Sequence, residues 1–450
     1  MKQPMRPTGM VAFLIIWFGQ IISLLGTSMT GFGQTIWAYE QTGQATALAM
    51  IGFFYVTPMV VLSPVAGAIV DRGNRKLMMM VSDLAAGVAT IGILILYTTG
   101  NLQIWHLFIS AVVAGTFQTF QWPAFSAAIT LMLPKEQYGR ANGLLELADT
   151  SANIFAPLLA GALLALVGFG GILIIDVVTF TVAIGALLFV HVPQPERTEA
   201  GRTGEGSIWQ ESVYGFRYIF NRSSLLGLQL VFTVGNWFST LAYVLLPVMI
   251  LARTGNSEMA LASVQSAGAV GGVVGGLVMS AWGGPKRRVH GVLAGWISAS
   301  LLGDALLGLG QILPVWMGAA FVGTFFVPVI NASNQSIWQA KVEPDVQGRV
   351  FSTRRLIAWA VMPLAQLVAG PLADQVFEPS MQGGGWLADT FGRLVGTGPG
   401  AGIALILVFC GIGGALSGIS GYAIRAIRDV EAILPDHDAA VEGAAAKAAV

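Results

Sequence analysis

The sequence predicts an all-α integral membrane protein with twelve transmembrane helices in two six-helix pseudo-repeat halves, and three observations lead to this prediction. Of the 450 residues, 55% are hydrophobic and only 10% are charged, against roughly 25% charged residues in soluble domains. Long apolar segments recur along the chain, and the second half repeats a pattern of the first. A bilayer core of about 30 Å needs about 20 residues per helix, so these segments are long enough to cross it.

The apolar segments fall into two sets of six. The first set lies near residues 10–36, 46–70, 77–98, 104–133, 141–168 and 170–190, and the second near 224–252, 259–282, 289–312, 314–341, 350–377 and 401–427. Pro and Gly inside these spans are tolerated because neighbouring helices can satisfy the freed backbone groups.

Four regions follow from these spans. Residues 1–192 form the N-terminal six-helix half, 193–223 a cytoplasmic linker, 224–428 the C-terminal half and 429–450 an acidic cytoplasmic tail. In the linker, Ser207 and Gln210 have the spacing of a capping box, which predicts a short amphipathic helix on the inner membrane surface. An early start to the seventh span is the alternative.

The basic residues set the orientation. With both termini cytoplasmic, every Lys and Arg except Arg253 and Arg393 falls in an inner loop or tail. Short cytoplasmic loops carry the excess of Lys and Arg in membrane proteins. Lys2 and Arg6 precede the first apolar run without a convincing cleavage site, which predicts an uncleaved first helix.

A short loop between the second and third spans carries the most specific motif. Its acid, bases and glycines are Gly67, Asp71, Arg72, Gly73, Arg75 and Lys76. Glycines allow a tight reversal between helices, and bases in a short loop mark the cytoplasmic side. The order and spacing resemble the signature between helices 2 and 3 of the major facilitator superfamily, and the resemblance implies a gating role. An ordinary positive-inside loop is the alternative.

The two halves repeat one another at a constant offset. Gly139-Arg140 aligns with Gly348-Arg349, and Gly67 aligns with Gly276, after which comes a degenerate basic loop, residues 283–288. Asp71 aligns with Ser280, so the second copy lacks the acid. We therefore expect Asp71 to bond to the start of the eleventh span, where Arg354, Arg355 and the free N–H groups of a helix N-terminus lie. Parallel repeats with substrate bound between them are typical of facilitator-type transporters.

Further segments resemble one branch of this superfamily, the drug/proton antiporters related to macrolide-efflux proteins and the enterobactin exporter. They are Asp176-x-x-Thr179-Phe180 in the sixth span, Gln339-Ala340-Lys341-Val342 and Gly348-Arg349-Val350-Phe351. Relatives often carry Arg three residues after the acid of the third span, whereas Asp83 is followed there by Ala86.

Acids inside the predicted spans are candidates for proton coupling, because each is costly in a bilayer unless it is paired or hydrated. They are Asp149, Glu146, Asp304 and Asp176, with Asp83 as a further intramembrane acid. No Lys or Arg is expected at comparable depth. Asp149 comes first because the fifth span lines the cavity in the family that the chain resembles. For Asp83, Asp176 and Asp304 the alternative is a bond between helices.

Aromatic and amide residues on the expected cavity helices predict a site for a bulky amphipathic molecule. The main candidates are Gln34, Gln118, Trp122, Asn236, Trp237, Asn334, Gln335 and Trp338. The alternative is that several of these face lipid or neighbouring helices.

These features predict a transporter and not an enzyme. A nucleotide-binding Gly-x-x-x-x-Gly-Lys-[Ser/Thr] loop and a zinc-binding His-Glu-x-x-His motif are absent from the sequence, so we expect no catalytic residue, metal or cofactor beyond a proton gradient. The net charge is zero, which argues against nucleic acid as a partner. We expect a monomer in the bacterial cytoplasmic (inner) membrane that exports amphipathic organic compounds, drug-like or siderophore-like, by proton antiport and alternating access. An uptake permease or a carrier of lysolipids or metabolites is the alternative, and a channel is the weaker one.

Overall fold

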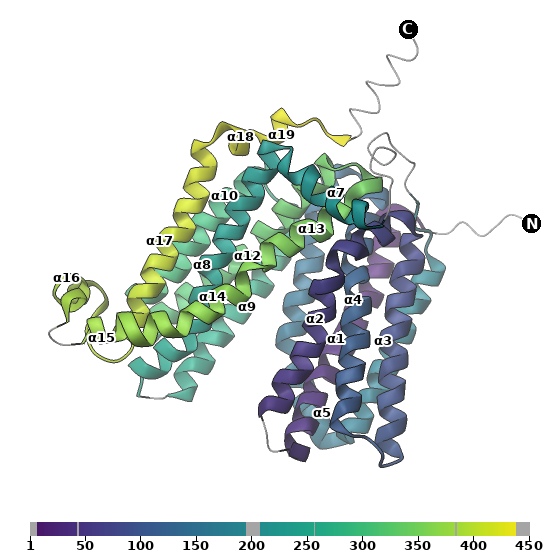
Figure 1. Cartoon of the computed structure of the whole chain (residues 1–450), viewed down its shortest axis with the longest axis horizontal. Coiled ribbons are helices and arrows are strands. Elements are labelled where there is room, and N and C mark those ends of the chain that lie inside the picture. Colours follow the sequence, from purple (N-terminus) through teal and green to yellow (C-terminus); the bar gives the residue numbers. More distant parts are fainter. Residues whose placement is uncertain (1–6, 43–44, 195–207, 256, 383–384, 438–450) are drawn as a thin grey trace, which may run out of the picture. The chain divides into compact units, whose positions relative to one another are not determined.

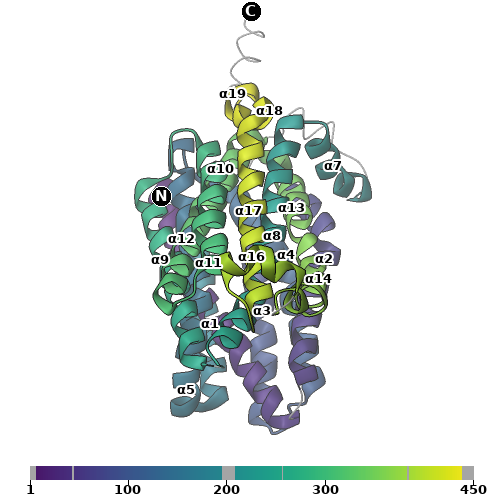
Figure 2. The ribbon, with the colours of Figure 1, turned by 90° about the vertical axis from the view of Figure 1, so that its left-hand side faces the viewer.

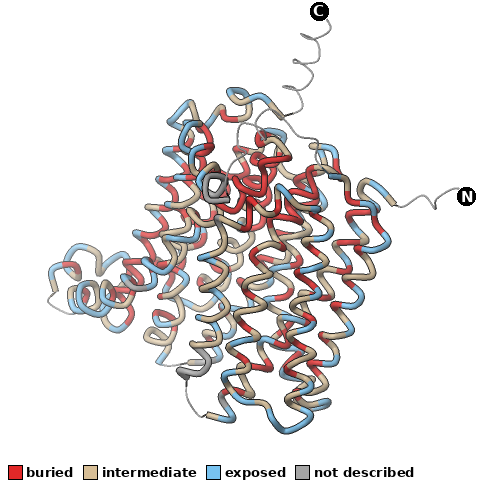
Figure 3. The backbone as a smooth tube through the Cα atoms, turned by 45° about the vertical axis from the view of Figure 1, so that its right-hand side comes forward, coloured by how far each residue is buried: buried red, intermediate tan, exposed pale blue. Residues whose placement is uncertain are grey.

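The computed structural model describes residues 7–42, 45–194, 208–255, 257–382 and 385–437, and these are helical with no strand among them. Ten helices in this part of the chain, and an eleventh that is bent, are long and apolar enough to cross a membrane. The predicted all-α membrane fold is confirmed. Along many of the long helices, such as α3, buried and exposed residues alternate, as expected when one face meets the bundle and the other the lipid (Figure 3).

The first six spans come from five helices. They are α1 (Gly9–Thr42), α2 (Ala45–Arg72), α3 (Arg75–Thr98), α4 (Ile104–Met132) and α5 (Tyr138–Phe189). The last of these contains two spans, because Gly168 adopts a left-handed conformation (φ 67°) that only glycine enters without strain. Its two apolar spans are Lys135–Leu164 and Leu166–Phe189.

The twelfth membrane-crossing helix is α4, which was predicted near residues 104–133 although its hydropathy is lower than that of the other spans. Its polar side chains include Gln118, Gln121 and Thr130, and these lower its apolar character. The helix packs against α2 and α3, and all four helices α1–α4 run side by side (Figure 1). Much of its surface is buried, so its polar groups bond to protein and not to lipid.

The second set of spans has more interruptions. Four of its spans are single helices: α8 (Ser223–Arg253), α9 (Glu258–Trp282), α12 (Leu313–Lys341) and α17 (Ala401–Ala423). The span between α9 and α12 consists of α10 (Arg288–Ser298), η2 (Ala299–Ala305) and α11 (Leu306–Leu309). The span between α12 and α17 consists of η3 (Pro344–Val346), α13 (Gln347–Trp359), α14 (Val361–Pro371), η4 (Leu372–Phe377) and α15 (Glu378–Ser380). The break after Trp359 has a local cause. Pro363 lacks the N–H that would bond to the carbonyl of residue 359.

Three short helices lie outside the spans of the second set. They are α16 (Trp386–Val395), between the eleventh and twelfth predicted spans, and α18 (Arg425–Arg428) and α19 (Val430–Ile433), which follow α17 at its far end (Figure 2). In the linker, α7 (Ile208–Phe220) is separated by two residues from α8, which begins at Ser223, so α7 is a helix of its own. The Ser207 cap predicted for it and the end of the acidic tail, residues 438–450, lie outside the described residues.

The chain divides into two compact units that each take a short segment from the other half of the sequence. The N-terminal unit is Met1–Ala141, Ala148–Tyr218 and Val342–Leu356. The C-terminal unit is Asn142–Leu147, Ile219–Lys341 and Ile357–Val450. The exchanged segments are the starts of the fifth and eleventh spans. The candidate gating loop and the start of the eleventh span therefore lie in the same unit, the N-terminal one.

Candidate gating and coupling sites

Asp71 binds the start of α13 inside the N-terminal unit. Its carboxylate accepts the backbone N–H groups of Gly348 (2.7 Å) and Arg349 (2.9 Å) and the Nε–H of Arg349 (3.1 Å). The side chains of Asp71 and Arg349 are only 2% and 5% exposed. The first N–H groups of a helix have no partner within the helix and carry its positive dipole end, so a carboxylate is well placed there.

The predicted side-chain partners of Asp71 were wrong in part. We expected Arg354 and Arg355, but the arginine at Asp71 is Arg349. Arg349 stands in the first turn of α13, beside the N–H groups that hold the carboxylate. Arg354 and Arg355 lie more than one turn further along the helix, which rises about 1.5 Å per residue.

Two glycines allow this close approach. A Cβ atom added to Gly67 would overlap the carbonyl oxygen of Gly348, and one added to Gly348 would lie 2.6 Å from the carbonyl oxygen of Gly67. Gly73 has a different role, since a Cβ there would lie 2.7 Å from Cε of Met78 within the reversal itself. Gly67 is therefore required by its contact with the backbone of the α13 start, whereas the Met78 side chain can move to make room at Gly73.

The bases of the motif point to different partners. Arg75 is fully buried and donates to the carbonyls of Ala127 (2.9 Å) and Pro344, the latter just before α13. Lys76 donates to the carbonyl of Val190 (2.7 Å) at the end of α5, and Arg72 is exposed. Asp71 and Arg75 thus both hold the segment 342–356.

Asp149 lies in a polar cluster of the N-terminal unit. Arg355 and Tyr55 are within electrostatic range of its carboxylate, and the Asp149 side chain is exposed although the residue stands in a membrane-spanning helix. The guanidinium carbon of Arg355 also lies 5.0 Å from the ring centroid of Trp122. The expectation that no Lys or Arg lies at a depth comparable to that of Asp149 therefore does not hold for the side chain of Arg355, because a long arginine side chain reaches past the depth assigned to its Cα.

Asp176 and Asp83 bond helix to helix. Asp176 is 2% exposed and accepts from Thr27 (3.1 Å) on α1 and Thr90 (2.9 Å) on α3. Asp83 accepts from Gln20 (2.8 Å) and Gln121 (3.0 Å). For Asp176 and Asp83 these bonds match the alternative to proton coupling, which was a bond between helices.

The remaining acids belong to the C-terminal unit. Glu146 lies in the start of the fifth span, which belongs to the C-terminal unit, and its carboxylate accepts from the amide of Asn331 (2.9 Å). Asp304 sits in the π-helical turn η2, half-buried, with Cys410 in electrostatic range. Among the described residues we find no hydrogen bond or ion pair to the carboxylate of Asp304.

The predicted cavity residues differ in exposure. In the N-terminal unit Gln34 is buried, whereas Gln118 and Trp122 are half-buried. In the C-terminal unit Trp237 is half-buried and packs on the apolar core, and Asn236 donates to the carbonyl of Ala358 (3.3 Å). Asn334, Gln335 and Trp338 are buried, and Trp338 is fully enclosed and donates to Asn334 (3.1 Å). Trp338 therefore packs inside the helix bundle and presents no ring face to a ligand.

One groove of about 660 Å³ opens on the N-terminal unit between α1 and the end of α5. Its lining is apolar, from Val11 and Trp17 to Ala186 and Phe189, and it contains none of the cavity candidates named in the sequence analysis. Such a groove is typical of a helix surface that faces lipid chains.

Twelve helices in two repeated halves, with a basic loop that holds the start of the eleventh span, define a multi-pass membrane transporter. The family model of the Major Facilitator Superfamily matches residues 16–365, and the chain belongs to this family.

Efflux proteins are among its relatives. The chain is 24% identical over 369 residues to macrolide efflux protein A of Streptococcus pyogenes, covering 81% of this chain and 90% of that protein. It is 25% identical over 377 residues to the multidrug efflux pump Tap of Mycolicibacterium fortuitum, covering 79% and 90%. Its fold is similar to that of a bacterial homologue of the iron transporter ferroportin in an outward-facing state, with a TM-score of 0.66, 16% identity and coverage of 91% and 98%.

Proposed function

We propose that this protein exports amphipathic organic compounds from bacteria by alternating access, driven by proton antiport. In this proposal it lies in the cytoplasmic membrane as a monomer with both termini inside. The efflux relatives support the direction of transport and the substrate class, since macrolides are large and amphipathic. The distribution of Lys and Arg supports the orientation.

The bond of Asp71 to the start of α13 is the observation that carries the mechanism. It joins residues of the first half of the sequence to residues of the second, and it uses charge-assisted hydrogen bonds. Each such bond contributes about 1.5–3 kcal/mol, so losing one shifts a two-state balance about tenfold or more. In the proposal this latch is closed when the carrier faces outward and opens when it faces inward.

Asp149 is the proposed coupling residue. An acid that stands in a membrane span within electrostatic range of an arginine has a partner for its charged form, so its charge can change as it binds and releases a proton. When Asp149 takes up a proton, its attraction for Arg355 ends, and the guanidinium keeps its contact with Trp122. The proton and the substrate would then meet at one cluster formed by Asp149, Arg355 and Trp122.

Transport in inverted membrane vesicles tests this proposal. With an acidic vesicle interior, a radiolabelled macrolide should accumulate inside, and an ionophore that exchanges potassium for protons should abolish the accumulation. Empty-vector vesicles are the control. Equal accumulation with and without the pH gradient would refute proton antiport, and accumulation only with the gradient reversed would refute export.

A further inference from the structure

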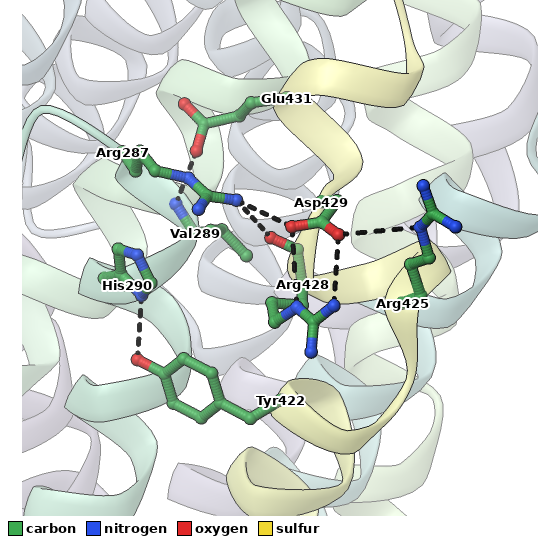
Figure 4. Close-up of polar contacts among 8 residues, drawn as sticks. All are labelled: Arg287, Val289, His290, Tyr422, Arg425, Arg428, Asp429 and Glu431. Atoms are coloured by element: carbon green, nitrogen blue, oxygen red, sulfur yellow. Dashed lines mark hydrogen bonds and ion pairs between the residues drawn. The ribbon is translucent and has the colours of Figure 1, made fainter.

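Residues 424–437 lie across the end of the C-terminal unit and contact four of its helices. Ile427 and Val430 are buried, and Ile427 packs so closely on α8 that a Cβ on Gly227 would lie 2.6 Å from it. Polar contacts join the same segment to the starts and ends of other helices (Figure 4). Nothing in the transport mechanism proposed above uses this segment.

The segment binds the second basic loop, residues 283–288, which is the degenerate copy of the gating loop. Arg287 donates to the carboxylate of Asp429 (2.9 Å) and to the carbonyl of Arg428 (3.0 Å) (Figure 4). Arg428 lies 3.3 Å and Arg425 3.9 Å from the same carboxylate. Hydrogen bonds from Arg428 and then Arg287 lower the pKa of Asp429, so this acid is charged at neutral pH.

The segment also supplies a helix cap that the loop itself lacks. In the first half, Asn74 caps α3 by accepting from the N–H of Leu77. In the second half, Arg287 precedes α10 and its side chain makes no cap bond, but Glu431 accepts from the N–H of Val289 (3.0 Å) (Figure 4). Asp429 therefore provides an acid near this loop, whose position aligned with Asp71 is Ser280, and Glu431 provides a cap for α10.

Lys341 is a further attachment point of the segment. This lysine ends α12, its side chain is only 4% exposed, and its ammonium donates to the carbonyls of Glu431 (2.6 Å) and Leu434 (2.5 Å). It also pairs with Asp436 at 2.8 Å. A buried ammonium needs several acceptors, and here all three of these acceptors come from the segment 431–436.

We propose that residues 424–437 are a strap that joins the ends of α8, α10 and α12, and that the carrier needs the strap in place to move the C-terminal unit as one body. The strap provides the acid and the helix cap that the second basic loop lacks. Only its consequence for transport depends on the proposed function, because the strap itself can be tested without substrate.

Hydrogen–deuterium exchange of the full-length protein in nanodiscs tests the strap. In Glu431→Ala and Lys341→Met, backbone amides near Val289 should exchange at least about fivefold faster, the factor that a helix cap of typical strength contributes. Glu431→Gln keeps an acceptor oxygen and should remain within about twofold of the wild type. Asp429→Asn removes the ion pair with Arg287, whose side chain is half-exposed, and should also have a small effect on the exchange rate.

Truncated chains provide the matched control. A chain that ends at His437 keeps the strap and should exchange and transport like the wild type, whereas one that ends at Ile424 should show the fast exchange and lose transport. Unchanged exchange near Val289 after Glu431→Ala and Lys341→Met would overturn the strap. Fast exchange with undiminished export would overturn its role in transport while leaving proton-coupled export intact.

Discussion

Asp71 and Arg349 are 278 residues apart in sequence, yet both backbone and side chain of Arg349 donate to the Asp71 carboxylate. The pair is almost completely buried. A buried carboxylate that satisfies a helix N-terminus and an arginine together is held firmly while the contact lasts and is costly to leave unpaired. This combination suits a latch with two defined states better than it suits a permanent surface ion pair.

The approach of Gly67 to Gly348 gives a steric test of the latch. Gly67→Ala places a methyl group against the Gly348 carbonyl and should prevent the latch from closing. Gly92→Ala on α3 is the matched control, since a Cβ there meets nothing within 4 Å. Export should fall by about tenfold or more in Gly67→Ala and stay within about twofold in the control, at equal amounts of folded protein in the membrane. Equal export by both variants would show that the close approach is not needed.

Asp149→Asn tests proton coupling. The amide cannot change charge, so transport driven by a pH gradient should be lost, while exchange of labelled for unlabelled substrate should continue at a rate near that of the wild type. Asp176→Asn is the comparison, because that acid is buried among threonine hydroxyls on neighbouring helices. Persistence of gradient-driven transport in Asp149→Asn would move the coupling role to another acid, with Asp304 next.

Trp122 and Trp338 should respond differently to truncation. Trp338 is fully enclosed, so Trp338→Ala should cost roughly 3–5 kcal/mol of stability and reduce the amount of folded protein. Trp122 is half-buried under Arg355, so Trp122→Ala should leave expression nearly unchanged and alter which substrates are exported. Size-exclusion profiles and resistance profiles of the two variants distinguish these effects. Similar losses of folded protein would show that both rings have packing roles.

Reporter insertions test the proposed orientation. A reporter after Val192 and one after Val450 should read cytoplasmic, and one after Gly396 in the predicted outer loop should read external, because nearly all Lys and Arg then lie inside. A cytoplasmic signal at Gly396 would contradict both the orientation and the proposed place of the basic loops.

The fold could be predicted from sequence because apolar length and the internal repeat are properties of the chain alone. The span near residues 104–133 was predicted in this way and is helix α4, although its glutamines and threonines make it less apolar than the other spans. The turn at Gly168 was also predictable, since two spans so close together require a sharp reversal. The π-helical turn around Asp304 was not, because it has no local sequence pattern.

The candidate site was only partly predictable. The motif located Asp71 and the helix start that it binds, but not its arginine partner, since Arg349, Arg354 and Arg355 all stand near that start. Depth along a helix axis does not give the direction of a side chain, and for this reason Arg355 was not expected beside Asp149, nor Trp338 inside the bundle. The acidic residues after Arg428 favour a solvated tail and do not predict that residues 424–437 pack on the helices. Ile427 and Val430, three residues apart as on one face of a helix, are the signal of partial burial in this segment.

The labelling rate of a cysteine under the latch tests the central claim most directly. Ser63 lies half-buried on α2 and its hydroxyl donates to the carbonyl of Ser352 (3.3 Å), so α13 restricts access to a cysteine there while Asp71 holds that helix. In a background with the single native Cys410 replaced by serine, a membrane-impermeant maleimide applied from the cytoplasmic side should label Ser63→Cys slowly. Adding Asp71→Asn should increase the rate about tenfold or more. Unchanged labelling in the double variant, with transport lost, would contradict the latch.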